Sequence, residues 1–242
     1  MDEITAIVPF YNEQIYLKKS VSRLLQENLF KNIVLVNDCS EDKSLKIAEE
    51  LALKFENITL VSTSKNLGKG NAVKIGLDYV TTKYVIVHDA DLEYFPSDIN
   101  EMLALSLKNK NSVVIGSRVI GNKKRINVYK RTFIIQKIFS KLFSILNSKK
   151  ISDLASCYWL IETETLKKFD IQESGFAIEV EVISKAIKYS LDIFEVPIKY
   201  HGRTYEDGKK IKLKDGILIL IKIFQYSYFF NNFIKKIKFL KI

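Results

Sequence analysis

VIVHDADLE, residues 85–93, begins as a β-branched apolar run and ends in acidic residues spaced two apart. Such a run is typical of a buried strand, so Asp89 is expected where the strand leaves the sheet. Carboxylates crowded at that point repel one another unless a cation lies between them. Hard divalent ions such as Mg²⁺ and Mn²⁺ prefer oxygen ligands and usually share them with substrate phosphates. A solvated acidic turn is the alternative for this stretch taken alone.

Strand-like and helix-like patterns alternate on both sides of this stretch. Strands are expected at 4–9, 32–37, 58–62, 84–88 and 112–117, and helices at 13–27, 42–54 and 69–80. Alternation with short connections predicts an α/β fold with a doubly wound, mostly parallel sheet and helices on both faces. A chain of 242 residues is long enough for one such domain.

Polar side chains gather after three of the expected strands, where each strand ends. Open α/β sheets bind ligands outside the carboxyl ends of their strands, so these clusters are expected to form one site. Each cluster alone is weak, because such residues are also common at helix N-termini. The residues concerned are Pro9, Tyr11, Asn12 and Glu13, then Asp38, Ser40 and Asp42, then Asp89 and Asp91.

A glycine-containing loop, NLGKGNA at residues 66–72, opens the third expected helix. Glycines allow a backbone to approach an anion closely, and Lys69 beside Gly68 adds positive charge. The spacing fits neither the GxxxxGK[ST] nor the GxGxxG pattern, so nothing here favours ATPase or dehydrogenase chemistry. A simple turn at Gly68 is the alternative.

The net charge of +10 is unevenly placed. Residues 121–150 hold nine Lys or Arg and no acid, residues 203–242 carry +7, and the rest of the chain carries −6. Two basic patches on an acidic body indicate an anionic partner, either nucleic acid or a phospholipid surface. The two cysteines and two histidines are too few and too scattered for a disulfide framework or a zinc site. An acidic start that runs directly into a strand is not typical of a signal peptide.

Together these motifs resemble the family 2 glycosyltransferases, which have the Rossmann-like GT-A fold. Within that family the chain looks most like the polyprenyl-phosphate sugar transferases, of which the dolichyl-phosphate mannosyltransferases are examples. The matching segments are residues 7–13, 36–42, 66–72, 88–98 and 116–118, the stretch from Ser174 to Glu181, and the run from Glu195 to Gly216. The likeness covers nearly all of residues 4–216.

The resemblance implies an inverting, metal-dependent hexosyltransferase that uses a GDP- or UDP-sugar donor. Asp89 and Asp91 would hold Mg²⁺ or Mn²⁺ on the donor diphosphate, with Glu93 assisting. Arg203 and Lys210 would lie on a loop that closes over the donor and the acceptor. The remaining donor-binding residues would be Pro9, Tyr11, Glu13, Asp38, Gly68, Lys69 and Ala90.

The acceptor side depends on the chemistry of the attacking group. A lipid phosphate is already ionised at neutral pH and needs cations rather than a base, and Arg118 and Arg131 suit that role. A saccharide or other hydroxyl acceptor would need a carboxylate base. Asp153 is the first candidate for that base, followed by Glu179 and Glu181. The segment 153–160 matches the family only loosely, so both acceptor interpretations stay open.

Membrane contact is expected from two segments. A basic amphipathic helix at about 126–148 is predicted to lie in a membrane interface, although a helix packed on the sheet is the alternative. Residues 217–242 form a basic, aromatic tail beyond a domain at 1–216, and no stretch is apolar enough to span a bilayer. The expectation is a cytoplasmic enzyme bound peripherally to a membrane and to its polyprenyl-phosphate acceptor.

Two interpretations from other classes compete with this one. A nucleic-acid-binding module would explain the basic patches but not Asp89 and Asp91, so no nucleic-acid partner is expected. A catalytically inactive membrane scaffold would retain the fold without the chemistry. The sequence leaves open the donor base and sugar, the metal, the lipid length, the oligomeric state and any separate membrane-anchor subunit.

Overall fold

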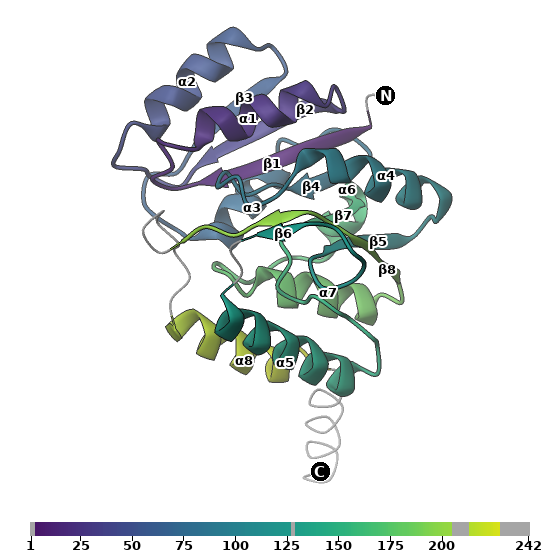
Figure 1. The fold of residues 1–242 in the computed structure, drawn as a ribbon. Coiled ribbons are helices and arrows are strands. Elements are labelled where there is room, and N and C mark those ends of the chain that lie inside the picture. Colours follow the sequence, from purple (N-terminus) through teal and green to yellow (C-terminus); the bar gives the residue numbers. More distant parts are fainter. Residues whose placement is uncertain (1–2, 127–128, 205–212, 228–242) are drawn as a thin grey trace, which may run out of the picture.

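A seven-stranded sheet forms the centre of the computed structural model, which describes residues 3–126, 129–204 and 213–227 (Figure 1). One strand runs antiparallel to both of its neighbours, and every other pairing in the sheet is parallel. The predicted mostly parallel sheet is therefore confirmed. In spatial order the strands are β3 (Ile58–Ser62), β2 (Phe30–Asn37), β1 (Ile4–Phe10), β4 (Tyr84–Val87), the antiparallel β7 (Trp159–Glu162), β5 (Ser112–Ser117) and β8 (Asp192–Pro197).

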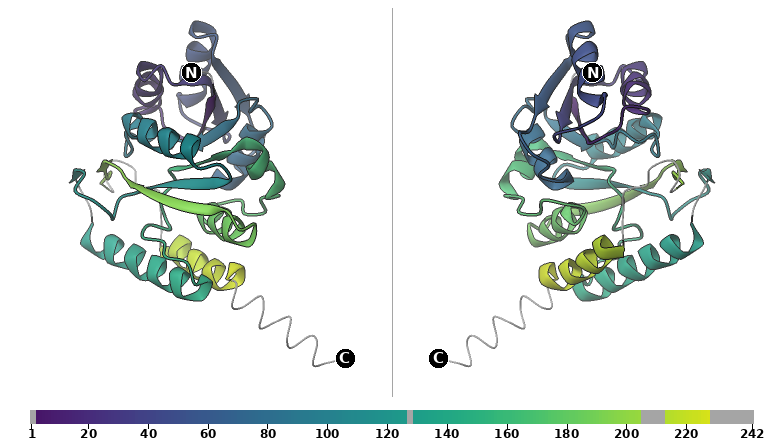
Figure 2. Two further views of the ribbon diagram at one scale, coloured as in Figure 1. Left: turned by 90° about the vertical axis from the view of Figure 1, so that its right-hand side faces the viewer. Right: turned by 90° about the vertical axis from the view of Figure 1, so that its left-hand side faces the viewer.

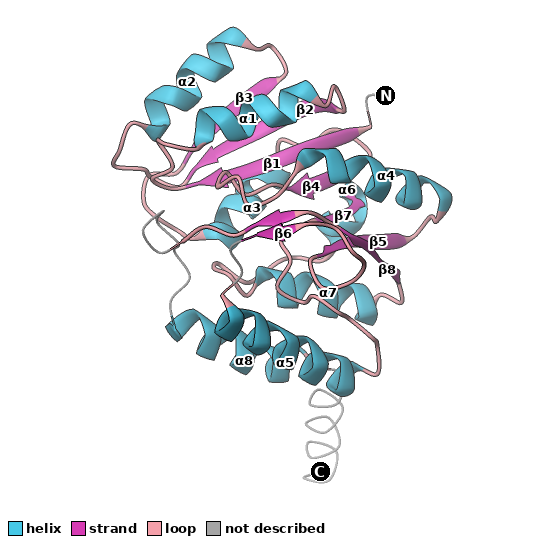
Figure 3. Ribbon diagram, in the orientation of Figure 1, coloured by secondary structure: helices cyan, strands magenta, loops and turns pink. Residues whose placement is uncertain are grey.

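Helices cover both faces of this sheet, as expected (Figure 3). Alternate residues of a strand point to opposite faces, so on β1 Ala6 and Val8 enter one core while Ile7 enters the other. The first core is completed by α1 (Leu17–Gln26), α2 (Ser44–Lys54) and α4 (Ile99–Lys108). The second core is completed mainly by α3 (Lys69–Leu77), α6 (Thr163–Lys168) and α7 (Ile178–Lys188).

A second, two-stranded sheet joins β6 (Arg125–Ile126) to β9 (Tyr200–His201) in parallel. The short 3-10 helix η1 (Pro96–Asp98) anchors this sheet, because the buried Asp98 accepts a hydrogen bond of 2.7 Å from the backbone N–H of Lys199. An isolated bridge between Tyr94 and Tyr200 makes a further attachment. The residues that follow β9 therefore lie at the carboxyl ends of the central strands, where Arg203 contacts Glu13 and Asp91.

Two helices, α5 (Lys130–Asn147) and α8 (Leu213–Tyr226), form an outer layer beyond α7 (Figure 2). The helix predicted at about 126–148 begins only at Lys130, because residue 126 belongs to β6. The boundary predicted after residue 216 falls inside α8, whose Ile223 is fully buried in the second core. The described part of the predicted tail is therefore packed against the domain, and the rest of it, residues 228–242, lies outside the described residues.

None of the helices in the described ranges has the length and apolar character needed to cross a membrane.

Candidate active site

The carboxyl ends of β1, β2 and β4 bring the predicted polar clusters to one edge of the sheet, at the left of Figure 1. Each of these strand ends is followed by a non-glycine residue with a positive φ: Asn12 at 50°, Cys39 at 61° and Leu92 at 64°. Left-handed backbone of this kind is energetically costly and is concentrated at functional sites in proteins. Three such residues at one edge make this edge the candidate site.

Asp38 organises the loop that follows β3. Its two carboxylate oxygens accept hydrogen bonds from the backbone N–H groups of Leu67 and Gly68, at 2.8 and 2.7 Å. The carboxylate is buried, so these bonds fix the loop opposite the end of β2. The structure thus gives Asp38 a positioning role in the site, and its predicted contact with the nucleotide stays a prediction.

Gly68 and Gly70 are needed by the protein's own packing. A Cβ atom at Gly68 would lie 2.6 Å from the backbone oxygen of Ser174, and one at Gly70 would lie 2.2 Å from that of Glu173. Gly68 also has a φ of +89°, which a side chain would strain. The close approach predicted here for a bound anion is therefore made by residues 173–174, because this segment presses on the start of α3.

Lys69 is held between two carboxylates. Its Nζ lies 2.9 Å from Asp89 Oδ1 and 2.9 Å from Glu179 Oε1. Burial alone would raise the pKa of Asp89, but the Lys69 charge together with hydrogen bonds from Cys157 and Lys69 outweighs burial and lowers it. Burial raises the pKa of Glu179, whose Oε2 has no hydrogen-bond partner among the described residues. Lys69, predicted to face an anion, therefore neutralises the site's own acids.

Arg203 joins the ends of β1 and β4. Its guanidinium lies 3.0 Å from Glu13 Oε2 and 3.2 Å from Asp91 Oδ2. Burial, followed by repulsion from Glu93 and Asp89, raises the pKa of Asp91 to about 8, even though Arg203 opposes the change. The negative charge of the carboxylates after β4 is therefore only partly balanced by Arg203.

The Glu93 carboxylate is held by Tyr200 and by the backbone of Arg203. Its Oε2 accepts a hydrogen bond of 2.7 Å from the Tyr200 hydroxyl, and its Oε1 accepts one of 2.7 Å from the Arg203 backbone N–H. These bonds turn the carboxylate towards β9. Across the described ranges, no group of three or more His, Cys, Asp or Glu side chains is arranged to hold a metal. The assistance of Glu93 in metal binding therefore stays a prediction, and the structure gives this carboxylate a second role in holding β9 and Arg203.

Asp89 and Asp91 still fit a divalent cation. They offer only hard oxygen ligands, they are close enough to raise the pKa of Asp91, and Arg203 partly compensates their charge. A pair of carboxylates completed by donor phosphates is the usual protein contribution to a Mg²⁺ site. We therefore keep Asp89 and Asp91 as the candidate ligands.

If the Arg203 guanidinium occupies the place of a metal cation beside Asp91, removing its charge should strengthen metal binding. We expect Arg203→Gln to lower the dissociation constant for Mn²⁺ by about tenfold in the absence of donor, since the guanidinium no longer competes with Mn²⁺ for Asp91. The same variant should transfer sugar more slowly, because the predicted closing residue is lost. Titration calorimetry measures the constant, with Lys199→Gln as the control. Unchanged or weaker Mn²⁺ binding would refute the competition.

Arg118 and Asp153 form a buried, forked pair behind the predicted acceptor side. Arg118 Nε and Nη2 donate to the two oxygens of Asp153 at 2.8 and 2.7 Å, and the Arg118 backbone N–H donates to Asp153 at 2.9 Å. The Nη1 group of Arg118 makes no hydrogen bond within the described residues. The guanidinium is therefore fixed in place, and it also lies over the Tyr94 and Tyr200 rings. Asp153 could act as a base only by giving up this pair.

Arg131, the second predicted phosphate ligand, lies on the first turn of α5 and is exposed. In the described part of the chain it makes no contact with Arg118. Lys210 falls among residues 205–212, outside the described residues. Pro9 is the last but one residue of β1 and Tyr11 follows the strand, while Ala90 is buried between the two candidate metal ligands.

A buried aromatic network supports these groups and was not predicted. His88 bonds to Ser20 Oγ at 3.0 Å and to the Tyr158 hydroxyl at 2.5 Å, and burial lowers its pKa to about 4. Tyr94 stacks on Tyr158 with ring centroids 4.6 Å apart. The neutral imidazole thus fixes the end of β4 directly before Asp89. The apolar run before His88 was the signal available in the sequence, because it indicates that His88 is buried. A buried histidine needs hydrogen-bond partners.

Glu181 is removed from the list of candidate bases. Its carboxylate is fully buried and accepts hydrogen bonds from the backbone N–H groups of Gln172 and Glu173, at 2.8 Å each for the shortest bonds. Its Oε1 also lies 2.6 Å from Lys185 Nζ on the next turn of α7. Glu181 therefore holds the segment that presses on Gly68 and Gly70.

We expect Glu181→Ala to destabilise the protein by about 3 kcal/mol, because the backbone N–H groups of Gln172 and Glu173 and the Lys185 cation lose their acceptor. The free energy of unfolding in urea measures the change. Glu164→Ala, at an exposed carboxylate, should change stability by less than about 0.5 kcal/mol. A Glu181→Ala protein that is fully stable but inactive would contradict the structural role.

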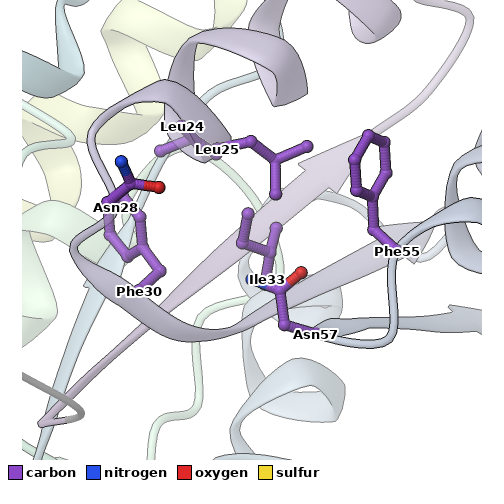
Figure 4. Close-up of a pocket in the computed structure, with 7 residues that line it drawn as sticks. All are labelled: Leu24, Leu25, Asn28, Phe30, Ile33, Phe55 and Asn57. Atoms are coloured by element: carbon purple, nitrogen blue, oxygen red, sulfur yellow. The ribbon is translucent and has the colours of Figure 1, made fainter.

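The pocket drawn in Figure 4 is not part of this site. It lies at the start of β2 and the end of α1, at the opposite edge of the sheet, and its polar side chains are two amides. Without a charged side chain it has nothing suited to a diphosphate. Its lining residues are Leu24, Leu25, Asn28, Phe30, Ile33, Phe55 and Asn57.

Comparisons with known proteins agree with this geometry. A dolichyl-phosphate beta-glucosyltransferase of Trichomonas vaginalis is 26% identical over 247 residues, covering 94% of this chain and 74% of that protein. An uncharacterised protein of Methanocaldococcus jannaschii is 27% identical over 237 residues, covering 94% and 93%.

Solved structures show the same fold at low identity. Glucosyl-3-phosphoglycerate synthase of Mycobacterium tuberculosis, solved with Mn²⁺, UDP-glucose and phosphoglyceric acid, matches with a TM-score of 0.72 and 14% identity, covering 93% of this chain and 79% of that one. TarS of S. aureus, solved with UDP-GlcNAc, matches with a TM-score of 0.63 and 18% identity, covering 93% and 66%. Both have the GT-A fold that the sequence resemblance implies.

The model of the family described as "Glycosyl transferase family 2" matches residues 5–169, which include β1, β2, β4 and the candidate site at their ends. This match covers more than half of the chain, so the protein belongs to glycosyl transferase family 2 and is a glycosyltransferase.

Proposed function

We propose that this enzyme transfers a hexose, either glucose or mannose, from a nucleotide-sugar to a polyprenyl phosphate, with inversion at the sugar carbon. The observation that carries the acceptor assignment is Arg118, a buried guanidinium oriented by Asp153 whose Nη1 group makes no hydrogen bond within the described residues. A fixed guanidinium is suited to a phosphate oxygen. The dolichyl-phosphate glucosyltransferase among the relatives supports a lipid phosphate.

On the donor side, Arg203 would contact the nucleotide diphosphate at the edge where Asp89 and Asp91 lie, and its partner Glu13 would contact the base or ribose. A divalent cation bound by Asp89 and Asp91 would supply Lewis-acid stabilisation of the departing diphosphate. The Mn²⁺ and UDP-sugar complexes of the fold relatives support this arrangement. The donor is thus proposed to be a UDP- or GDP-sugar.

The chemical step needs no proton transfer when the acceptor is an ionised phosphate. One acceptor oxygen forms a bond to the sugar C1 from the face opposite the diphosphate. The bond from C1 to the leaving phosphate oxygen breaks, and its electron pair leaves with the nucleoside diphosphate. Arg118 holds the acceptor oxygen in line. Asp153 keeps Arg118 in place, and both oxygens of Asp153 accept hydrogen bonds from Arg118.

The choice between a phosphate and a hydroxyl acceptor is tested by matched lipids. Polyprenyl phosphate and the free polyprenol of the same chain length are dispersed in detergent and offered with one labelled donor. We expect label in the phosphate lipid only. If the polyprenol or a soluble saccharide is labelled instead, the enzyme uses a hydroxyl acceptor, and Asp153 becomes the candidate base.

We also propose that the enzyme acts peripherally at the cytoplasmic face of a membrane, where such an acceptor is found. The basic segment at 121–150 and the apolar positions of α5 support this location. Whether a separate subunit anchors the enzyme is tested by assaying the purified chain alone. Full activity on detergent-dispersed lipid would show that catalysis needs no second subunit.

A further inference from the structure

Tyr200 lies between the two sides of the candidate site. It belongs to β9, is only 8% exposed and packs in the first core beside Tyr94, with the two ring centroids 5.5 Å apart. Its backbone N–H donates a hydrogen bond of 3.1 Å to the carbonyl oxygen of Lys124. The protein itself therefore fixes the position of this side chain.

The ring of Tyr200 contacts the acceptor side. The guanidinium carbon of Arg118 lies 5.1 Å from the centroid of this ring and 5.9 Å from that of Tyr94. A cation at such a distance over an aromatic ring is attracted to it, and more strongly where water is excluded. Arg118 is buried, so the ring adds a second contact to the hydrogen bonds that Asp153 accepts.

The hydroxyl of Tyr200 contacts the donor side. It donates a hydrogen bond of 2.7 Å to Glu93 Oε2, while Glu93 Oε1 accepts one of 2.7 Å from the Arg203 backbone N–H. The backbone carbonyl oxygen of Glu93 accepts a third, of 2.9 Å, from the N–H of His201. Glu93 therefore binds residues 200–203 at three points.

This attachment determines where the Arg203 side chain begins. Its guanidinium contacts Glu13 and Asp91 at 3.0 and 3.2 Å, and its Nε is a buried donor without a hydrogen-bond partner among the described residues. An oxygen of the donor diphosphate would satisfy that Nε. Loss of the Tyr200 hydroxyl would leave Glu93 with one oxygen free and weaken the attachment of the Arg203 backbone.

We propose that Tyr200 is a positioning residue for both substrates of the transfer. Its ring orients Arg118 on the acceptor side. Its hydroxyl acts through Glu93 and orients Arg203 on the donor side. One side chain thus fixes two cations relative to each other, and an in-line displacement depends on that placement. The ring's role rests on the proposed function, whereas the hydroxyl's role is testable without an acceptor.

Tyr200→Phe removes the hydroxyl and keeps the ring. We expect this variant of the full chain to bind UDP or GDP in Mn²⁺, whichever the wild type binds more tightly, about fivefold more weakly. Its KM for polyprenyl phosphate should stay within about twofold of wild type. Titration calorimetry measures the nucleotide affinity. The matched control is Tyr189→Phe, because Tyr189 also stacks on a ring and donates through its hydroxyl, at 3.3 Å to the Lys168 carbonyl oxygen.

A double-mutant cycle shows whether the hydroxyl acts through Arg203. In an Arg203→Gln background, Tyr200→Phe should weaken nucleotide binding no further. Additive losses would overturn the proposed route. So would an unchanged nucleotide affinity in Tyr200→Phe, or an equal loss in Tyr189→Phe.

Tyr200→Met removes the ring while filling most of its space. We expect the same nucleotide affinity as in Tyr200→Phe, together with a KM for polyprenyl phosphate raised about fivefold, because Arg118 loses an aromatic contact. An acceptor KM no higher than in Tyr200→Phe would overturn the role of the ring. Urea unfolding shows whether each variant is folded. If Tyr200→Met does not fold, Tyr200→Phe decides alone, since equal rises in its donor and acceptor constants would contradict the division of roles.

The outcomes separate this inference from the proposed function. If the wild type labels only a hydroxyl acceptor, the proposed function fails, and calorimetry still decides the role of the hydroxyl. If polyprenyl phosphate is labelled while Tyr200→Phe binds the nucleotide like wild type, the inference alone fails.

Discussion

Asp91→Asn is expected to slow sugar transfer by about 10²–10³-fold while leaving the protein as stable as wild type. The loss is expected because Asp91 is proposed to bind the divalent cation that stabilises the negative charge of the leaving diphosphate. The stability is retained because the substitution relieves repulsion among buried carboxylates, of which Asp89 and Glu93 are the neighbours. Initial rates at saturating Mn²⁺, together with urea unfolding, measure both effects.

Glu50→Gln is the control for this experiment, since Glu50 is an exposed carboxylate on α2 away from the site. It should change neither the rate nor the stability. A stable Asp91→Asn enzyme with wild-type activity would remove Asp91 from the mechanism. An unfolded variant would instead show that Asp91 is a structural residue.

The second large effect is expected at the Arg118–Asp153 pair. Asp153→Ala should destabilise the protein by about 3–5 kcal/mol, because it leaves a buried guanidinium without its partner. The double variant Arg118→Met/Asp153→Leu should recover most of that loss, since apolar residues of similar volume replace a buried ion pair at little cost. Urea unfolding of the three proteins measures these differences.

The double variant separates folding from catalysis. It should be stable and yet transfer sugar to polyprenyl phosphate about 10²-fold more slowly than wild type, because the guanidinium that would hold the acceptor is missing. Arg118→Lys, which keeps the charge without the fork, should show an intermediate rate. A stable double variant with wild-type transfer would make the pair purely structural and would remove the acceptor assignment.

The sequence was sufficient to predict the half of the sheet that contains the donor side. Strands such as β1 and β4 are buried on both faces, so their apolar runs are continuous and easy to locate, and all five predicted strands are present within two residues at either end. The polar residues after them follow from the rule that parallel strands end at one edge. Asp89 and Asp91 were found in this way.

The sequence was insufficient where a residue's role depends on a distant partner. Arg118 and Asp153 were both singled out, but their pairing across 35 positions was not visible, so Asp153 was considered only as a candidate base for a hydroxyl acceptor. The bond of Glu93 to Tyr200 links residues 107 positions apart, so the sequence did not reveal it. Likewise β7 was not predicted, since an antiparallel insertion between β4 and β5 has no local signal.

The orientation of α5 shows a different limit. Its pattern predicted an amphipathic helix, but either side could have faced the sheet. The burial of Phe143 in the second core and the hydrogen bonds that Ser140 and Ser144 accept from residues 151–154 fix the orientation. The periodicity of the helix does not encode these hydrogen bonds. The structure was needed to show that the isoleucines point outward.

The central claim is that the enzyme transfers a sugar from a nucleotide donor to a lipid phosphate with the help of a divalent cation. It is tested most directly by incubating the purified chain with radiolabelled GDP- and UDP-sugars and polyprenyl phosphate, with Mn²⁺, with Mg²⁺ and with EDTA, and extracting the product into organic solvent. We predict that one donor labels the lipid, that EDTA abolishes the labelling, and that Asp91→Asn shows at most trace labelling. An unlabelled lipid with every donor, while soluble saccharides are extended, would contradict the account.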